Sequence, residues 1–287
     1  MITYFQAIIL GFLQGISELF PISSLGHSVI FPRLFGWNIH QDASYFLTFL
    51  VATHFATALV LFLFFWKDWK RILQGIFRSL KEREIKESDT DAKLGWLLVV
   101  GTIPAGILGI LFQDSLKAFF SSPQIVAFFL IANGVMLFLG EMLRRKKSFG
   151  IVRETEGRIA KTSWAQAVGV GASQSLALFP GFSRTGSTLV GGLLVGLSHE
   201  DAVRYSFLLA TPIIAAAALL KLPELFTIPS ENLFLGQTLA GTICAGIAAY
   251  FSVRFLTKYF ETKNLIPFAL YCVIFGVFSS AVFLFGR

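Results

Sequence analysis

Residues 14–27 read QGISELFPISSLGH, and residues 179–188 read FPGFSRTGST. Each segment places Pro, Gly, Ser and an ionisable group near the middle of a longer apolar region, 4–37 in the first case and 164–197 in the second. One continuous membrane helix is not expected there, because Pro and Gly disturb the helical hydrogen-bond pattern. We therefore expect each region to form a helical hairpin that enters the membrane and returns.

Outside these segments the chain has the composition of a membrane protein. Of its 287 residues, 55% are hydrophobic and only 14% are charged, and the mean hydropathy is +0.70. A soluble domain carries roughly 25% charged residues, so the soluble, fibrous and disordered classes are excluded. Six more apolar stretches are long enough to cross about 30 Å of hydrocarbon. They are Tyr45 to Trp66, Leu94 to Phe112, Ile125 to Leu143, Tyr205 to Leu222, Leu233 to Phe255 and Leu265 to Phe285.

The two hairpin regions resemble each other at a fixed offset of 160 residues. The matching residues are Gln6, Ala7, Gly11, Gln14, Ser23 and Gly26 with Gln166, Ala167, Gly171, Gln174, Ser183 and Gly186. This pattern predicts a duplication, with repeat one at residues 1–143, a cytoplasmic linker at 144–162 and repeat two at 163–287. Each repeat holds one hairpin and three spans, and because three is odd, the second copy is expected to be inverted. The predicted fold is an all-α, polytopic membrane helix bundle with two inverted-topology repeats.

Basic residues indicate the orientation of the spans. The net charge is +7, and the 24 Lys and Arg residues gather in loops between apolar runs, so nucleic acid is not an expected partner. If loops 66–94 and 143–164 are cytoplasmic, 19 of these residues lie on that side and 4 on the other, with Arg184 inside the second hairpin. The positive-inside rule then places both termini and the mouth of the first hairpin outside.

An alternative organisation has eight or more plain spans, in which the interruptions are ordinary kinks. An N-terminal region that crossed the membrane once would reverse every later helix of its half. A region whose return leg also spanned would keep the charge distribution unchanged.

The first polar segment has the residues of a buried anion site. Irregular backbone at membrane depth is buried in protein or lines a wet cavity, so a cavity is expected here. Gln14 and Glu18 are four residues apart and share one helix face. Ser23, Ser24 and His27 follow the proline, where a second helix would begin with free N–H groups that suit an anion.

The second polar segment has the groups that bind phosphate. Gly181 and Gly186 allow close backbone approach, four hydroxyls can donate hydrogen bonds, and Arg184 offers a planar guanidinium. The hydroxyls belong to Ser183, Thr185, Ser187 and Thr188. An Arg at the centre of a membrane costs about 2.5–3.5 kcal/mol on insertion scales, so Arg184 and Glu18 each require a partner, an ion or a ligand. The alternative is an ion pair between them that only fixes the packing of the hairpins.

Other polar residues are interpreted as structural. His54 is expected to be hydrogen-bonded in the core, and Glu200 to pair with Arg204 one helical turn later. Gly192 and Gly196 form a GxxxG pattern typical of close helix packing. Helix caps or anchors are expected at His40, Asp42, His199 and Asp201.

Segments Gln14 to His27 and Pro180 to Thr188 resemble the two signature motifs of the bacterial undecaprenyl-diphosphate phosphatases, membrane enzymes linked to bacitracin resistance. The first motif is a Glu/Gln-x-x-x-Glu element followed by a Ser-Gly-His-like element, and the second is Pro-Gly-x-Ser-Arg-Ser-Gly. The length, span number and repeat agree with this family over essentially the whole chain. Three positions depart from the usual pattern, namely Gln14, Leu25 and Thr185.

The resemblance implies hydrolysis of a C55 isoprenoid diphosphate to the monophosphate, which recycles the lipid carrier for peptidoglycan and other envelope polymers. It also implies a location in the bacterial inner membrane, with an active site open to the outer face. The expected partners are the polyprenyl diphosphate and membrane lipids, and a homodimer is left open. A transporter or flippase for an anionic or lipid-phosphate substrate is the alternative, because inverted repeats with broken helices recur in carriers.

Roles for the site residues follow from this activity. The predicted catalytic residues are Glu18, Ser24, His27 and Arg184. The predicted substrate-binding residues are Gln14, Ser23, Gly181, Ser183, Thr185, Gly186 and Thr188. Glu18, with Gln14 as a neutral oxygen ligand, is expected to hold Mg²⁺ or Ca²⁺. The nucleophile is left open between Ser24 activated by His27, His27 itself and a metal-bound water.

Overall fold

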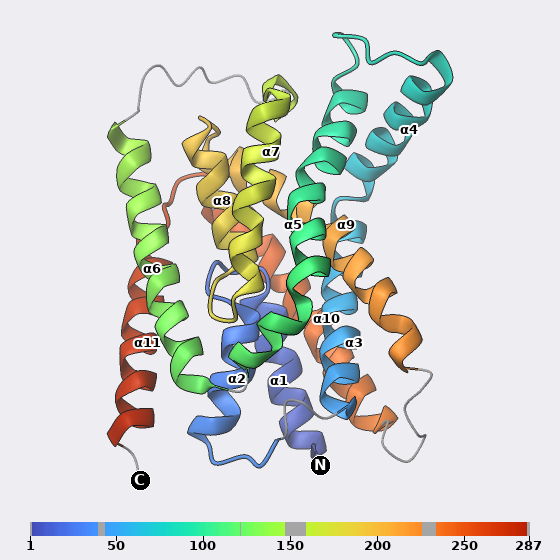
Figure 1. The fold of residues 1–287 in the computed structure, drawn as a ribbon. Helices are drawn as coiled ribbons and strands as arrows, with labels where there is room; N and C mark the ends of the chain where they lie inside the picture. Colours follow the sequence, from blue (N-terminus) through green and yellow to red (C-terminus); the bar gives the residue numbers. More distant parts are fainter. Residues whose placement is uncertain (1, 40–43, 121, 147–158, 226–233, 286–287) are drawn as a thin grey trace.

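The computed structural model describes residues 2–39, 44–120, 122–146, 159–225 and 234–285, and these residues form an all-α bundle (Figure 1). They contain eleven α-helices and two short 3₁₀ helices and no strand. The predicted class, a polytopic membrane helix bundle, is therefore confirmed. Most of the predicted linker 144–162, together with His40 and Asp42, lies outside the described residues.

Six long helices correspond to the six predicted spans. They are α3 (Ser44–Phe64), α5 (Thr90–Phe120), α6 (Pro123–Lys146), α9 (His199–Leu225), α10 (Leu235–Tyr259) and α11 (Ile266–Phe285). Five of them, all but α3, are each long and apolar enough to cross a membrane by themselves. The sixth candidate is α3 together with α4 (Trp66–Glu82), which is bent by 82° relative to it. The basic region after α3, predicted as a loop, thus contains a helix.

The two predicted hairpins are pairs of short helices. The first is α1 (Tyr4–Ser17) with α2 (Ser24–Leu34), and the second is α7 (Trp164–Ser173) and η2 (Gln174–Leu178) with α8 (Arg184–Leu194). The longest, α1, has 14 residues and is about 21 Å long, which is too short to cross the hydrocarbon. Figure 1 shows α1–α2 entering from the lower end and α7–α8 from the upper end, so that their tips meet in the middle.

Equivalent contacts in the two hairpins agree with the 160-residue offset. Both hairpins begin with a capping box, Thr3 with Gln6 and Ser163 with Gln166. A Cβ on Gly11 would lie 2.1 Å from the carbonyl oxygen of Gly241 in α10, and a Cβ on Gly171 would lie 2.0 Å from that of Gly101 in α5. Glycine is therefore required where each hairpin packs on a span of the other half. Duplication and inversion of the complete halves stay predictions.

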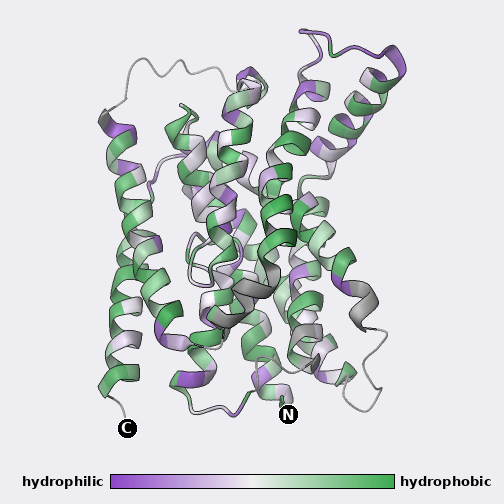
Figure 2. Ribbon diagram, in the orientation of Figure 1, coloured by the Kyte–Doolittle hydropathy of each residue, from purple (hydrophilic) through white to green (hydrophobic). Residues whose placement is uncertain are grey.

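The bundle surrounds the irregular turns with protein. Apolar side chains dominate the middle of the long helices, and polar residues concentrate toward the ends (Figure 2). In the irregular turns themselves, five of the six residues 18–23 and three of the five residues 179–183 are buried. This burial satisfies the condition under which non-helical backbone is tolerated at membrane depth.

Two of the structural interpretations require correction. Arg204 does not pair with Glu200 but donates from Nη2 to Oδ1 of Asp68 in α4, at 2.7 Å. Gly196 does not pack against another helix: its φ is +102°, and a Cβ there would meet nothing within 4 Å. Gly196 instead supplies the left-handed conformation that ends α8, because L-residues rarely adopt it.

The expected anchors at the start of α9 are confirmed. The Asp201 N–H donates to the Ser198 hydroxyl, which donates to the Asp201 carboxylate. His199 Nε2 lies 2.7 Å from Oε2 of Glu141 and so attaches α9 to α6.

Candidate active site

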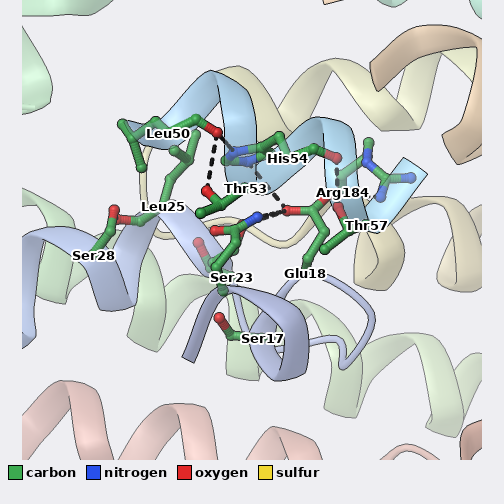
Figure 3. Close-up of polar contacts among 12 residues, drawn as sticks. Ser17, Glu18, Ser23, Leu25, Ser28, Leu50, Thr53, His54, Thr57 and Arg184 are labelled. Atoms are coloured by element: carbon green, nitrogen blue, oxygen red, sulfur yellow. Dashed lines mark hydrogen bonds and ion pairs between the residues drawn. The ribbon is translucent and has the colours of Figure 1, made fainter. Parts of the chain in front are cut away.

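Glu18, at the end of α1, is the centre of a buried polar cluster (Figure 3). Its Oε1 accepts a hydrogen bond from Nη2 of Arg184 at 2.8 Å, across the two hairpins. Its Oε2 accepts from Nε2 of Gln14 at 3.1 Å and from the Ser24 hydroxyl at 2.5 Å. His54 Nε2 lies 3.3 Å from the same oxygen. Three of the four predicted catalytic residues, Glu18, Ser24 and Arg184, therefore meet directly.

His54 was expected to be hydrogen-bonded in the core; the structure shows such a hydrogen bond and also places the ring at the Glu18 cluster. Nδ1 of His54 is 2.8 Å from the carbonyl oxygen of Leu50, and because a carbonyl only accepts, Nδ1 carries the proton. Nε2 faces the carboxylate of Glu18, with which it forms an ion pair when the ring carries both protons. Figure 3 shows Glu18 with His54 and Arg184 around its carboxylate.

Asn133 of α6 holds the two hairpin tips together. Its Nδ2 donates to the carbonyl oxygen of Pro21 at 3.0 Å, and its Oδ1 accepts from the Ser183 N–H at 3.0 Å. Thr185 adds a direct connection by donating to the carbonyl oxygen of Glu18 at 2.9 Å. Because Asn133 and Thr185 are both fully buried, these bonds fix the distance between the first and second polar segments.

Ser24 and His27 do not form the predicted pair. Ser24 is the first residue of α2, and its hydroxyl donates to Glu18 rather than to the imidazole. Nδ1 of His27 is 2.6 Å from the Ser23 carbonyl oxygen, and Nε2 is 2.7 Å from the hydroxyl of Tyr271 in α11. The imidazole therefore donates to Ser23 and accepts from Tyr271 when neutral. The Ser24 hydroxyl has the Glu18 carboxylate as its base.

The N-cap serines of α2 and α8 have the same hydrogen bond. Ser23 accepts from the Gly26 N–H and Ser183 accepts from the Gly186 N–H, each at 3.1 Å. Ser23 has a φ of 70°, an uncommon conformation for a residue with a side chain. Both serine hydroxyls therefore cap the start of a helix. Their predicted contact with substrate stays a prediction.

Three other predicted substrate-binding residues have structural contacts. Thr188 is fully buried, and its hydroxyl bonds the carbonyl oxygens of Arg184 and Thr185 and the hydroxyl of Ser206. A Cβ on Gly181 would lie 2.6 Å from the backbone of α6, and one on Gly186 would lie 3.3 Å from the Pro21 side chain. These glycines bring α6 and the hairpin tips together, and their contact with a ligand stays a prediction.

Several polar groups at the cluster have no partner in the described part of the chain. Gln14 Oε1 and Arg184 Nη1 are buried and unbonded. The first two N–H groups of α2 and of α8 likewise have no acceptor among the described residues. A buried, unpaired polar group costs about 1–3 kcal/mol, so these donors and this acceptor favour a bound polar ligand.

The cluster offers two oxygen donors to a cation. They are the Glu18 carboxylate and the free Oε1 of Gln14, and the described residues contain no group of three His, Cys, Asp or Glu that could hold a metal. Mg²⁺ is commonly bound by one or two carboxylates, with substrate phosphates and water completing its coordination. The donor set fits an ion of that kind only together with a substrate.

Sequence reasoning missed His54, Asn133 and Tyr271. Each is a polar side chain with mainly apolar neighbours in a long helix, in α3, α6 and α11 respectively. Ionisable and strongly polar groups at membrane depth are expensive, and that cost was the available signal for the first two.

The chain is similar to known proteins over nearly its whole length. Residues 7–278 match the family described as "Bacitracin resistance protein BacA". The chain is 45% identical to an undecaprenyl-diphosphatase of Mycolicibacterium paratuberculosis, over 96% of this chain and 95% of that protein. It is 39% identical to undecaprenyl-diphosphatase 2 of Frankia alni, over 98% of each. It is 44% identical to undecaprenyl-diphosphatase 1 of Burkholderia pseudomallei, over 97% of this chain and 96% of that protein.

Proposed function

The chain belongs to the family of bacitracin resistance protein BacA, and we propose that it hydrolyses undecaprenyl diphosphate to undecaprenyl phosphate and inorganic phosphate. The observation that carries the proposal is the contact of Ser24, Glu18 and Arg184 beside unpaired buried groups. A hydroxyl, a carboxylate base and a guanidinium are the groups that phosphoryl transfer requires. The relatives named above are diphosphatases, and none bears the name of a transporter.

Ser24 is the nucleophile in this proposal. Its hydroxyl already donates to Glu18 Oε2, so the carboxylate takes the proton as Oγ attacks the terminal phosphorus. The new Oγ–P bond forms as the anhydride P–O bond breaks, and undecaprenyl phosphate leaves. Water then attacks the phosphoserine, the Oγ–P bond breaks, and the proton held by Glu18 returns to Ser24. His27 is a weaker nucleophile candidate, because both of its nitrogens have partners.

Arg184 holds the phosphate charge. One guanidinium nitrogen, Nη2, is occupied by Glu18, while Nη1 is buried and free to donate to a nonbridging oxygen. The free N–H groups at the starts of α2 and α8 can donate to the same anion, and helix N-termini favour negative charge. The second hairpin thus contributes charge and the first contributes the reacting groups.

His54 and His27 act as positioning residues. His54 restrains the Glu18 oxygen that receives the Ser24 proton, and its ring is itself held by Leu50. His27 bonds the Ser23 carbonyl and so supports the turn on which Ser24 lies. Loss of either imidazole is expected to misplace the nucleophile or its base, and a misplacement of about 1 Å can cost 100-fold in rate.

A divalent cation, Mg²⁺ or Ca²⁺, is the proposed cofactor. Glu18 and Gln14 would hold it, since they supply the carboxylate and the free amide oxygen of the cluster. When bound, such an ion would neutralise charge on the phosphate oxygens.

We further propose that the protein lies in the bacterial inner membrane with this site open to the outer face. Support comes from the 19 basic residues assigned to one side against 4 on the other. In Figure 1, α1 begins and α11 ends at one end of the bundle, and α6 ends at the opposite end. A homodimer stays a prediction.

Phosphate release by the purified protein in detergent tests the activity. A detergent solution has no membrane that separates two compartments, so transport cannot account for the release. Ser24→Ala should lose release by a factor of about 1,000 or more. Ser28→Ala is the matched control, since its hydroxyl lies one turn later on α2 and, among the residues that the structure describes, bonds only the Leu25 carbonyl. A quenched single turnover with terminally labelled substrate should trap phosphoserine. Labelled histidine would move the nucleophile to His27, and absence of any phosphoenzyme would favour attack by water.

A further inference from the structure

Helix α4 follows directly on α3, which corresponds to the predicted span Tyr45 to Trp66. The 21 residues of α3 are about 31 Å long, close to the thickness of the hydrocarbon. At Phe65 the chain bends by 82°, so α4 leaves the axis of α3 almost at a right angle. Helix α4 therefore lies at the end of the bundle where α3 ends and α5 begins (Figure 1). It packs on α5, and the buried residues on that face are Trp69, Ile72, Gly75 and Ser79.

A second apolar stripe of α4 faces away from the protein. Trp66, Leu73, Phe77 and Leu80 are exposed by 49%, 40%, 71% and 56%. Their spacings of seven, four and three residues place them on one side of the helix. Such a stripe beside the first turn after a membrane span suits the boundary between acyl chains and headgroups.

Basic side chains border this apolar stripe along one edge. Lys67, Lys70 and Lys81 are exposed and form no ion pair within the described residues. Arg78, in contrast, is held by two hydrogen bonds to Asp89. Figure 2 shows hydrophobic and hydrophilic residues alternating along α4. Long cationic side chains beside an apolar stripe can reach headgroup phosphates while their stems cover acyl chains.

A surface hollow lies between the apolar stripe and the basic side chains along its edge. It has a volume of about 470 Å³ and is lined by Gln74, Phe77, Arg78 and Lys81. The lining combines an aromatic ring with amide and cationic donors, and it lies on α4 rather than at the Glu18 cluster.

We propose that the outer face of α4 binds the headgroups of anionic phospholipids in the adjacent leaflet. The apolar stripe would enter the acyl boundary, and Lys67, Lys70 and Lys81 would contact the phosphates. Anionic lipid is the occupant because the three unpaired charges of this face are all positive, whereas a zwitterionic surface would leave them uncompensated. The inference is independent of the proposed diphosphatase activity.

Native mass spectrometry of the full-length protein, delipidated and supplied with equal phosphatidylglycerol and phosphatidylcholine, measures the preference directly. A Lys or Arg near an anionic surface contributes about fivefold in affinity, so a variant with Lys67, Lys70 and Lys81 all changed to Gln should lose the preference at least about tenfold. The matched control changes three exposed lysines of other segments, Lys161, Lys258 and Lys263, to Gln. It should keep the preference.

The wild-type protein provides a second test that needs no variant. Raising the salt from about 0.05 M to about 0.5 M should reduce phosphatidylglycerol retention severalfold, because exposed charges are screened. Equal retention of the two lipids by the wild type, or equal losses in the two triple variants, would overturn the proposal. Phosphate release in detergent should be the same for wild type and the α4 variant, so a failure of the lipid proposal is distinguishable from a failure of the proposed function.

Discussion

Replacing Asn133 by Leu should separate the two hairpin tips. The Asn133 amide joins the Pro21 carbonyl to the Ser183 N–H, with both hydrogen bonds at 3.0 Å. Leu keeps the branching at Cγ but has no polar group, so the Ser183 N–H would lose its partner and the Pro21 carbonyl would keep only the long contact with Cys272 Sγ, at 3.9 Å. Ser183 directly precedes Arg184, and Pro21 lies between Glu18 and Ser24, so the change acts on the reacting groups without touching them.

The magnitude follows from the two groups that lose the Asn133 amide. A buried group without a partner costs about 1–3 kcal/mol, which gives roughly 2–6 kcal/mol for the pair. Hydrogen bonds inside membrane proteins contribute less, about 0.6 kcal/mol on average, because alternative partners are found. The low end of the first range is the better value, since Asn133 is fully buried but the cluster contains other polar groups. We therefore expect a loss of about 2 kcal/mol in the free energy of unfolding.

Two measurements check this prediction. Phosphate release in detergent should fall at least tenfold in Asn133→Leu, and the unfolding midpoint should decrease. Thr211→Val is the control, because within the described part of the chain the Thr211 hydroxyl bonds only the Phe207 carbonyl of its own helix. The inference that Asn133 aligns the hairpins would be refuted by a variant that unfolds earlier and yet turns over substrate at the wild-type rate.

Three further predictions concern other parts of the molecule. Tyr271→Phe removes the hydroxyl 2.7 Å from Nε2 of His27, and release should fall about fivefold, as expected for one hydrogen bond of roughly 1 kcal/mol; an unchanged rate would contradict this role. Gly171→Val should prevent folding, judged by size-exclusion chromatography, because a Cβ there would lie 2.0 Å from a carbonyl oxygen of α5. The hydrogen bond from Arg78 holds the pKa of Asp89 below its ordinary value. The pair therefore stabilises the α4–α5 turn fully at any pH above the ordinary pKa of Asp. This contribution is lost as the pH falls through the lowered pKa, and Asp89→Asn should reduce the acid sensitivity of the unfolding midpoint.

The hairpins and the six spans could be predicted because their signals are local. The length of an apolar run, and a Pro or Gly that interrupts it, are properties of one segment. The meeting of Glu18 and Arg184 could also be predicted, since each is too expensive at membrane depth to remain alone. That cost identifies which groups require partners. It does not specify which side of a helix each group faces.

The partner of Ser24 could not be predicted for this reason. His27 is closer in sequence, but the start of α2 turns the Ser24 hydroxyl toward Glu18, and the imidazole faces α11 instead. These directions depend on how separate helices pack, which no single segment encodes.

Position along a span is a signal that sequence does contain. His54 lies at the middle of α3, and Asn133 lies near the middle of α6, so both reach the level at which the hairpin tips meet. Glu141 is buried like Asn133 but lies one and a half turns from the end of α6, and it joins His199 and the Leu265 N–H away from the Glu18 cluster. A polar residue at the centre of a span is therefore a candidate for the site, whereas one near its end is more simply an anchor. The same rule, applied to the spans of a relative, would select its hairpin-facing residues before any packing is known.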